Sequence, residues 1–125
     1  MQNNPKRRIL IIDDNASFRD LMRIMLSNEG FAVEVAEDAV EGGKAMVAAQ
    51  PDLVICDIDM PYMDGLELLS ALRSDPSTAS LKVILLSGRK DIETLTKAEQ
   101  LGVLDYLIKP VTRERLLESI NSCLT

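Results

Sequence analysis

Five polar residues that could do chemistry stand directly after short apolar runs of the sequence. They are a pair of acids, a single acid, a hydroxyl and an amine: Asp13 and Asp14, Asp57, Ser87 and Lys109. The chain contains no histidine, so an imidazole cannot serve here as a base, a metal ligand or a phosphate carrier. Any chemistry must therefore use carboxylates, hydroxyls and lysine.

The apolar runs alternate with segments of helical periodicity. The runs predict strands at 9–12, 31–36, 53–56, 81–86 and 104–108. Helices are predicted at 16–29, 38–49 and 91–101, and after the capping residues Asp64 and Thr112. Asp38 and Glu41 have the spacing of a capping box, and Gly30 and Gly102 stand where a left-handed residue ends a helix. Strict alternation predicts a doubly wound α/β fold, a flavodoxin-like (βα)5 three-layer sandwich with a parallel sheet of order 2-1-3-4-5.

This sheet would bring the acids together. Its first and third strands are neighbours, and ligands in such sheets bind beyond the carboxyl ends of the strands, where the winding direction reverses. Asp13, Asp14 and Asp57 would share that crevice. Two carboxylates about 4 Å apart repel by roughly 4 kcal/mol at an effective dielectric near 20, so the cluster needs a cation. An all-oxygen donor set favours Mg²⁺, or Mn²⁺, over zinc or copper.

Taken singly, each residue has an ordinary explanation. The acid pair could cap a helix, Asp57 and Ser87-Gly88 could belong to turns, Lys109 could be a surface lysine, and Tyr106 could be half-buried packing. The functional interpretation depends on all of them occurring together at strand ends.

Four segments resemble the receiver family of response regulators, the phosphorylated partners in two-component phosphorelays. They are ILIIDDN at 9–15, LVICDIDMPYMDG at 53–65, LLSG at 85–88 and DYLIKP at 105–110. The resemblance runs from end to end and is of the single-domain chemotaxis-regulator kind. It implies that Asp57 accepts a phosphoryl group and that Asp13, Asp14, Asp57 and the backbone carbonyl of Asp59 hold the metal. It also implies that Ser87, Gly88 and Lys109 receive the phosphoryl oxygens.

The same resemblance implies how a signal would leave the site. The donor would be a sensor histidine kinase or a histidine phosphotransfer protein, because the chain has no histidine of its own. Ser87 would move toward the phosphoryl group, and Tyr106 on the fifth strand would move inward behind it. The surface of the fourth helix, fifth strand and fifth helix would then control a downstream protein.

Asp59 and Arg89 carry opposite charges two residues beyond Asp57 and Ser87. We hypothesise that they pair when the loop closes and so affect how water reaches the acyl phosphate; the alternative is two separately solvated charges.

Two other classes of protein fit parts of the pattern. The Asp57-Ile58-Asp59 spacing resembles the nucleophile motif of haloacid-dehalogenase phosphatases, although in that family the motif stands near the chain start and precedes the metal acids. A flavodoxin-like binding module would need a glycine- and hydroxyl-rich loop where Asp13 and Asp14 stand. A third interpretation keeps the receiver but makes it a fragment or a phosphate sink without an output. Apart from self-phosphorylation by small donors and self-dephosphorylation, we expect no enzymatic activity.

Composition limits the remaining possibilities. The 125 residues suit one domain, expected at 1–125 with a short polar extension at 1–7. A net charge of -6 disfavours nucleic acid, and no apolar segment is long enough for a membrane span or a signal peptide, so a cytoplasmic protein is expected. Cys56 and Cys123 are expected to be reduced thiols, and the chain to be a monomer or a phosphorylation-dependent dimer.

Overall fold

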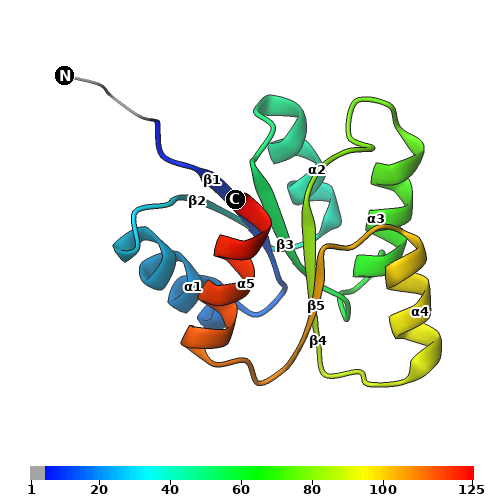
Figure 1. The fold of residues 1–125 in the computed structure, drawn as a ribbon. Helices are drawn as coiled ribbons and strands as arrows, with labels where there is room; N and C mark the ends of the chain where they lie inside the picture. The colour runs from blue at the N-terminus through cyan, green and yellow to red at the C-terminus, as the bar shows by residue number, and fades with distance from the viewer. Residues whose placement is uncertain (1–4) are drawn as a thin grey trace.

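The computed structural model describes residues 5–125 and contains five strands alternating with five helices (Figure 1). In chain order they are β1 (Arg8–Ile12), α1 (Ala16–Asn28), β2 (Ala32–Ala36), α2 (Ala39–Ala48), β3 (Leu53–Asp57), α3 (Gly65–Ser74), β4 (Val83–Ser87), α4 (Ile92–Gln100), β5 (Asp105–Ile108) and α5 (Arg113–Leu124). Every predicted element is present, with its ends shifted by one or two residues. The predicted extension at 1–7 lies partly outside the described residues.

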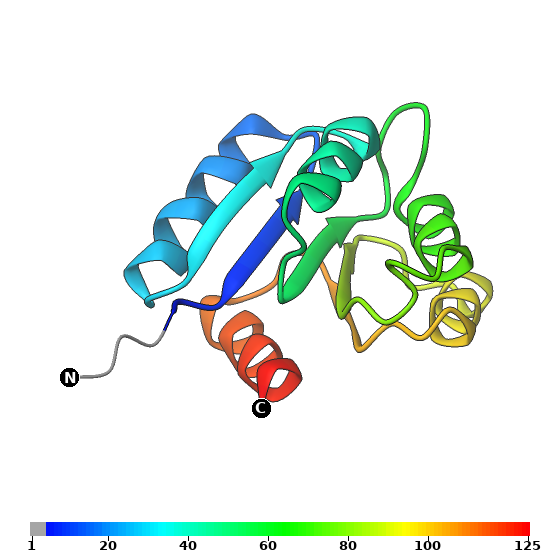
Figure 2. The ribbon, with the colours of Figure 1, turned by 90° about the horizontal axis from the view of Figure 1, so that it is seen from above.

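All four strand pairings are parallel, and the sheet order is β2-β1-β3-β4-β5, as predicted. Helices α1 and α5 cover one face of the sheet, and α2, α3 and α4 cover the other (Figures 1 and 2). The strands β1 and β3 lie side by side at the centre, with Ile12 paired to Cys56. The residues that follow or end these two strands therefore meet at one edge of the sheet.

Two layers of apolar side chains fill the space between the sheet and the helices. Alternate residues of β1 and β3 point to opposite faces, which is why both strands read as continuous apolar runs. Ile9 and Ile55 pack with Met22 and Ile120 of the α1 and α5 layer. The opposite layer contains Leu10, Ile12, Val54 and Cys56 with side chains of α2, α3 and α4.

The helix caps explain where the loops turn. Asn15, rather than either preceding acid, caps α1, because its side chain accepts from Phe18 N at 2.9 Å. This leaves Asp13 and Asp14 free of that structural role. Of the capping box predicted at Asp38, the described chain shows one bond: the Asp38 side chain accepts from Glu41 N. The Glu41 carboxylate pairs with Lys44 instead of returning to the Asp38 backbone. Asp64 and Glu67 instead form a complete box at the start of α3.

The predicted strand at 81–86 begins later, at Val83, because the backbone before it is held by Arg73. The Arg73 guanidinium donates to the carbonyls of Ala79, Leu81, Leu101 and Gly102 at 2.7–3.1 Å. One side chain thus ties the loop before β4 to the end of α4. Sequence periodicity gave no sign of this arrangement.

Cys56 is buried and Cys123 is half-buried, and both are free thiols, in agreement with the expectation. Burial raises the pKa of Cys56, and the nearby Asp57 carboxylate raises it further, so the thiol stays protonated. Within residues 5–125, no helix has the length and apolar character needed to cross a bilayer.

Candidate functional site

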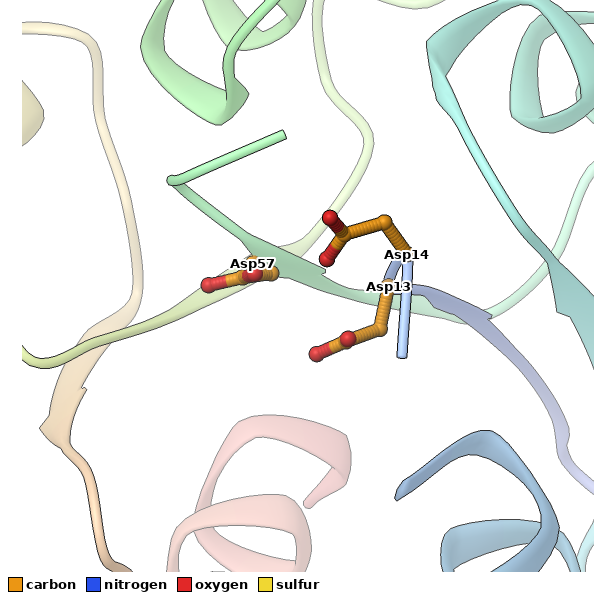
Figure 3. A group of neighbouring side chains, drawn as sticks. All are labelled: Asp13, Asp14 and Asp57. Carbon is orange, nitrogen blue, oxygen red and sulfur yellow. The ribbon is translucent and has the colours of Figure 1, made fainter. Parts of the chain in front are cut away.

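Three carboxylates converge at the carboxyl ends of β1 and β3 (Figure 3). One oxygen from each of Asp13, Asp14 and Asp57 lies within 4.8 Å of the other two. Asp13 and Asp57 are buried, with 1% and 6% of their surface exposed, while Asp14 is open to solvent. The three carboxylates predicted to meet therefore do so, and Asp14 makes the cluster reachable from solvent.

Lys109 supplies a positive charge to this cluster. Its Nζ lies 3.2 Å from Asp13 Oδ2 and 3.3 Å from Asp57 Oδ1. In the described chain it is the one Lys or Arg whose nitrogen comes within 4.0 Å of any of the three carboxylates. One ammonium against three acids leaves the site net negative. A hard divalent cation fits that imbalance and the all-oxygen donor set.

The environment shifts the pKa values of both partners. Burial raises the pKa of Asp57, and the Asp13 charge adds to this, while Lys109 opposes it. For Lys109, burial alone would lower the pKa, but the Asp13 and Asp57 carboxylates raise it above its ordinary value. Lys109 therefore stays charged at neutral pH.

The position of Asp57 is fixed by close packing of its backbone against the start of α3. Asp57 ends β3, and Gly65 N, at the start of α3, donates to Ile58 O at 2.8 Å. A Cβ built on Gly65 would lie 2.4 Å from the Asp57 carbonyl oxygen. Only glycine permits this approach, so α3 holds the acceptor strand end closely. Nothing in the sequence around Gly65 indicated this role.

Ser87 ends β4 and is fully buried. Its Oγ accepts from Arg89 N at 3.0 Å. Gly88 lies between these two residues, and a Cβ added to it would meet no atom within 4 Å. Tyr106 on β5 is half-buried, and its hydroxyl donates to the Arg89 carbonyl at 3.0 Å. Arg89 thus contacts both residues that the sequence suggested as parts of a switch.

The Asp59 side chain turns toward Arg89 rather than into the acidic cluster. Arg89 Nη2 and Nε lie 2.7 Å and 2.9 Å from Asp59 Oδ1. The two residues therefore form the ion pair that the sequence analysis suggested.

Two residues of α1 also touch the site without having been predicted to do so. Lys109 Nζ sits 4.9 Å from the centre of the Phe18 ring, a cation–π contact. Arg19 Nη1 donates to the Asp13 carbonyl at 2.7 Å. Phe18 was visible in the sequence only as a member of an apolar stripe.

This fold and site define a doubly wound domain with an acidic, lysine-containing pocket at its topological switch point. The family model described as "Response regulator receiver domain" matches residues 9–121. The chain belongs to this family, the receiver domains of two-component response regulators.

Individual relatives agree with that assignment. The chain is 36% identical over 117 residues to the "DNA-binding dual master transcriptional regulator RpaA" of Synechocystis, covering 94% of this chain and 48% of the relative. It thus spans about half the length of the curated relatives it matches. The chemotaxis protein CheY4 of Vibrio cholerae superposes with a TM-score of 0.90 at 28% identity, covering 96% of this chain and all of the other. A CheY-like receiver domain protein from Methanospirillum hungatei JF-1 gives 0.87 at 33% identity, covering 96% and 94%. These likenesses lend no support to the haloacid-dehalogenase interpretation.

Proposed function

We propose that this receiver works as a phosphorylation switch whose acceptor is the carboxylate of Asp57. The observation that carries the proposal is the Lys109 ammonium, 3.3 Å from Asp57 Oδ1 and 3.2 Å from Asp13 Oδ2. An ionised carboxylate is a competent nucleophile toward phosphorus, and phosphoryl transfer depends mainly on positioning and charge neutralisation. A carboxylate held beside an ammonium at the mouth of an acidic pocket meets both requirements.

We propose that Asp13, Asp14, Asp57 and the backbone carbonyl of Asp59 hold Mg²⁺, or Mn²⁺. When bound, this ion would supply the remaining positive charge for the incoming phosphoryl group. Three oxygens within 4.8 Å, and a net negative charge after Lys109 is counted, support this assignment. The outward turn of the Asp59 side chain, toward Arg89, is consistent with a ligand role for its carbonyl alone.

The chemical step is a direct displacement at phosphorus. One Asp57 oxygen attacks, the new P–O bond forms as the bond from phosphorus to the donor's leaving atom breaks, and the bonding electron pair leaves with the donor. Lys109 would stabilise the phosphoryl oxygens from the side of Asp13. Ser87 and the Gly88 backbone would receive another oxygen, because the Ser87 hydroxyl accepts from Arg89 N and keeps its own proton to donate.

We further propose that the donor is a histidine kinase or a histidine phosphotransfer protein and that the output face is formed by α4, β5 and α5. Tyr106 links the site to this face through its bond to the Arg89 carbonyl. Asp105, its neighbour in β5, accepts from Ser119 at 2.6 Å and Arg115 at 3.2 Å in α5. A movement of β5 would therefore be transmitted to α5. Partner control and phosphorylation-dependent dimerisation would both use this face.

Incubation with Mg²⁺ and acetyl phosphate, followed by intact mass measurement, tests the proposal. We expect one added phosphoryl group on the wild type, none on Asp57→Asn, and none when the metal is chelated. Asp20→Asn, which removes an exposed acid of α1, is the matched control and should be phosphorylated like the wild type. Full phosphorylation of Asp57→Asn would refute the assignment of the acceptor.

A further inference from the structure

The ring of Phe18 faces the positive charge that lies in the acidic cluster. Lys109 Nζ lies over this ring, 4.9 Å from its centre. The same nitrogen lies 3.2 Å from Asp13 Oδ2 and 3.3 Å from Asp57 Oδ1. Within residues 5–125, no third protein oxygen lies within hydrogen-bonding distance of it. Because an ammonium has three N–H donors, the ring face is the remaining partner of this charge.

The ring is held more firmly than the lysine that it contacts. Phe18 N donates to Asn15 Oδ1 at 2.9 Å, so the ring stands in the first turn of α1, directly after the acid pair. Its side chain packs against the apolar layer that contains Met22 and Leu116. Lys109, by contrast, follows β5, and its side chain is 30% exposed. A fixed ring can therefore hold an ammonium that would otherwise be free to turn toward solvent.

From these contacts, and resting on the proposed phosphorylation of Asp57, we infer that Phe18 is a positioning residue for Lys109. The negative face of the ring attracts the ammonium and keeps it beside Asp57, where it stabilises the oxygens of an incoming phosphoryl group. A cation–π contact of a partly exposed ammonium shifts an equilibrium by roughly two- to fivefold. The ring therefore increases the phosphorylation rate by about that factor.

This role differs from packing and from contact with a donor protein. Packing depends on the size of the side chain, whereas the attraction depends on the electron density of the ring face. Fluorine atoms on the ring withdraw electron density with little change in size. Contact with a donor protein plays no part when acetyl phosphate is the donor. A loss of rate that grows with each fluorine atom, measured in acetyl phosphate, would therefore identify the attraction itself.

A double-mutant cycle measures the contact in the absence of metal and donor. The wild type, Phe18→Leu, Lys109→Met and the double variant are unfolded with urea in the presence of a chelator. We expect the two changes to be coupled by about two- to fivefold in the unfolding equilibrium constant, since they remove the two sides of one contact. Strictly additive changes would overturn the role of Phe18.

Proton NMR of the same metal-free proteins gives a spectroscopic signature of the contact. The ring current of Phe18 should shift the ε-methylene protons of Lys109 upfield in the wild type. The shift should be lost in Phe18→Leu and kept in Phe18→Tyr, which retains an aromatic ring. Lys109 signals that are the same in all three proteins would mean that the ring does not hold the lysine.

Phosphorylation rates in acetyl phosphate and Mg²⁺ then test the positioning. We expect Phe18→Leu to be about two- to fivefold slower than the wild type and Phe18→Tyr to match the wild type. Phenylalanines with one, two or three ring fluorine atoms at position 18 should give rates that fall step by step toward that of Phe18→Leu. In Lys109→Met, the further change Phe18→Leu should cost nothing, because the ring acts through the lysine.

Phe31→Leu is the matched control. It removes the chain's other phenylalanine, which packs against the same apolar layer, and over whose ring no Lys or Arg lies in the described chain. Its folded form should be phosphorylated like the wild type. Rates unaffected by ring fluorination, or an equal loss from Phe18→Leu with and without Lys109, would overturn the inference. Failure of the wild type to be phosphorylated would instead refute the proposed function, while the metal-free cycle would still decide whether the contact exists.

Discussion

Lys109 Nζ lies 3.3 Å from Asp57 Oδ1, although Asp57 ends β3 and Lys109 follows β5, two strands that are not neighbours in the sheet. The strand β4 separates β3 from β5, and Lys109 reaches across its end, where Lys109 N donates to the Ser87 carbonyl at 2.8 Å. The lysine is thereby placed beside both the acceptor and Asp13. This relationship gives the domain a nucleophile next to a fixed positive charge.

Replacing Lys109 by Met should leave the protein folded but greatly slow its phosphorylation. Loss of a fixed charge that stabilises a developing anion typically lowers a rate by about 10²- to 10³-fold. The Lys109 side chain is 30% exposed but its carboxylate partners are buried, so the free energy of unfolding should fall by about 1–3 kcal/mol, between the costs of breaking an exposed and a buried ion pair. Phosphorylation rates by intact mass and urea unfolding measure the two effects. Lys44→Met, at an exposed ion pair of α2, should change neither, and equal losses of rate and stability would contradict the role of Lys109.

Replacing Asp57 by Asn should stabilise the metal-free protein at neutral pH. Burial raises the pKa of Asp57, so folding favours its protonated form, and this penalty grows as pH rises from 3.8 through the raised pKa. We expect the free energy of unfolding to rise by on the order of 1 kcal/mol at pH 7. This is a fraction of the repulsion between close carboxylates, because Lys109 offsets part of that repulsion. The gain should shrink as pH falls toward 3.8.

Urea unfolding of the wild type and of Asp57→Asn across this pH range, in the presence of a chelator, measures the difference in their free energies of unfolding. Glu37→Gln, an exposed acid, should show no such pH-dependent gain. Added Mg²⁺ should stabilise the wild type more than Asp57→Asn. An Asn variant less stable than the wild type at pH 7 would mean that the site is not electrostatically strained.

Gly65→Ala should damage both stability and phosphorylation. The new methyl group would meet the Asp57 carbonyl at 2.4 Å, and backbone cannot move aside cheaply. Overpacking of this kind costs about 1–3 kcal/mol and would displace the acceptor strand end. Gly43→Ala in α2 is the matched control, since its methyl group would meet nothing within 4 Å and should stabilise by roughly 0.5–1 kcal/mol. Thermal unfolding and phosphorylation rates distinguish the two, and a neutral Gly65→Ala would show that the contact can relax.

Arg73→Ala should be severely destabilising yet leave the site chemistry intact. Its guanidinium satisfies four backbone carbonyls, and charged hydrogen bonds of this type are worth more than neutral ones. We expect a loss of roughly 2–4 kcal/mol in the free energy of unfolding, only partly recovered by Arg73→Lys, because an ammonium cannot reach all four oxygens. Protein that remains folded should still take up one phosphoryl group. A loss below about 0.5 kcal/mol in urea unfolding, as expected for the exposed Arg23→Ala, would show that Arg73 is dispensable.

The sequence by itself determined the fold and the components of the site. Apolar runs of strand length alternating with capped helices permit one common architecture, and in it the ends of the first and third strands must be neighbours. Asp13, Asp14 and Asp57 were therefore predictable as a cluster. Local chemistry such as the Asp64 cap was predictable as well, because it depends on residues a few positions apart.

Only the tertiary structure decided the contacts that join distant loops. The reach of Lys109 to Asp13, the approach of Gly65 to the Asp57 carbonyl and the four bonds of Arg73 depend on side-chain directions and backbone distances across elements. Periodicity carries no such information. The charges of Asp59 and Arg89 suggested an ion pair. Only the folded loop shows that the backbone of Arg89 also binds Ser87 and Tyr106. The partners of a residue's N–H and carbonyl are set by the fold and not by the type of side chain.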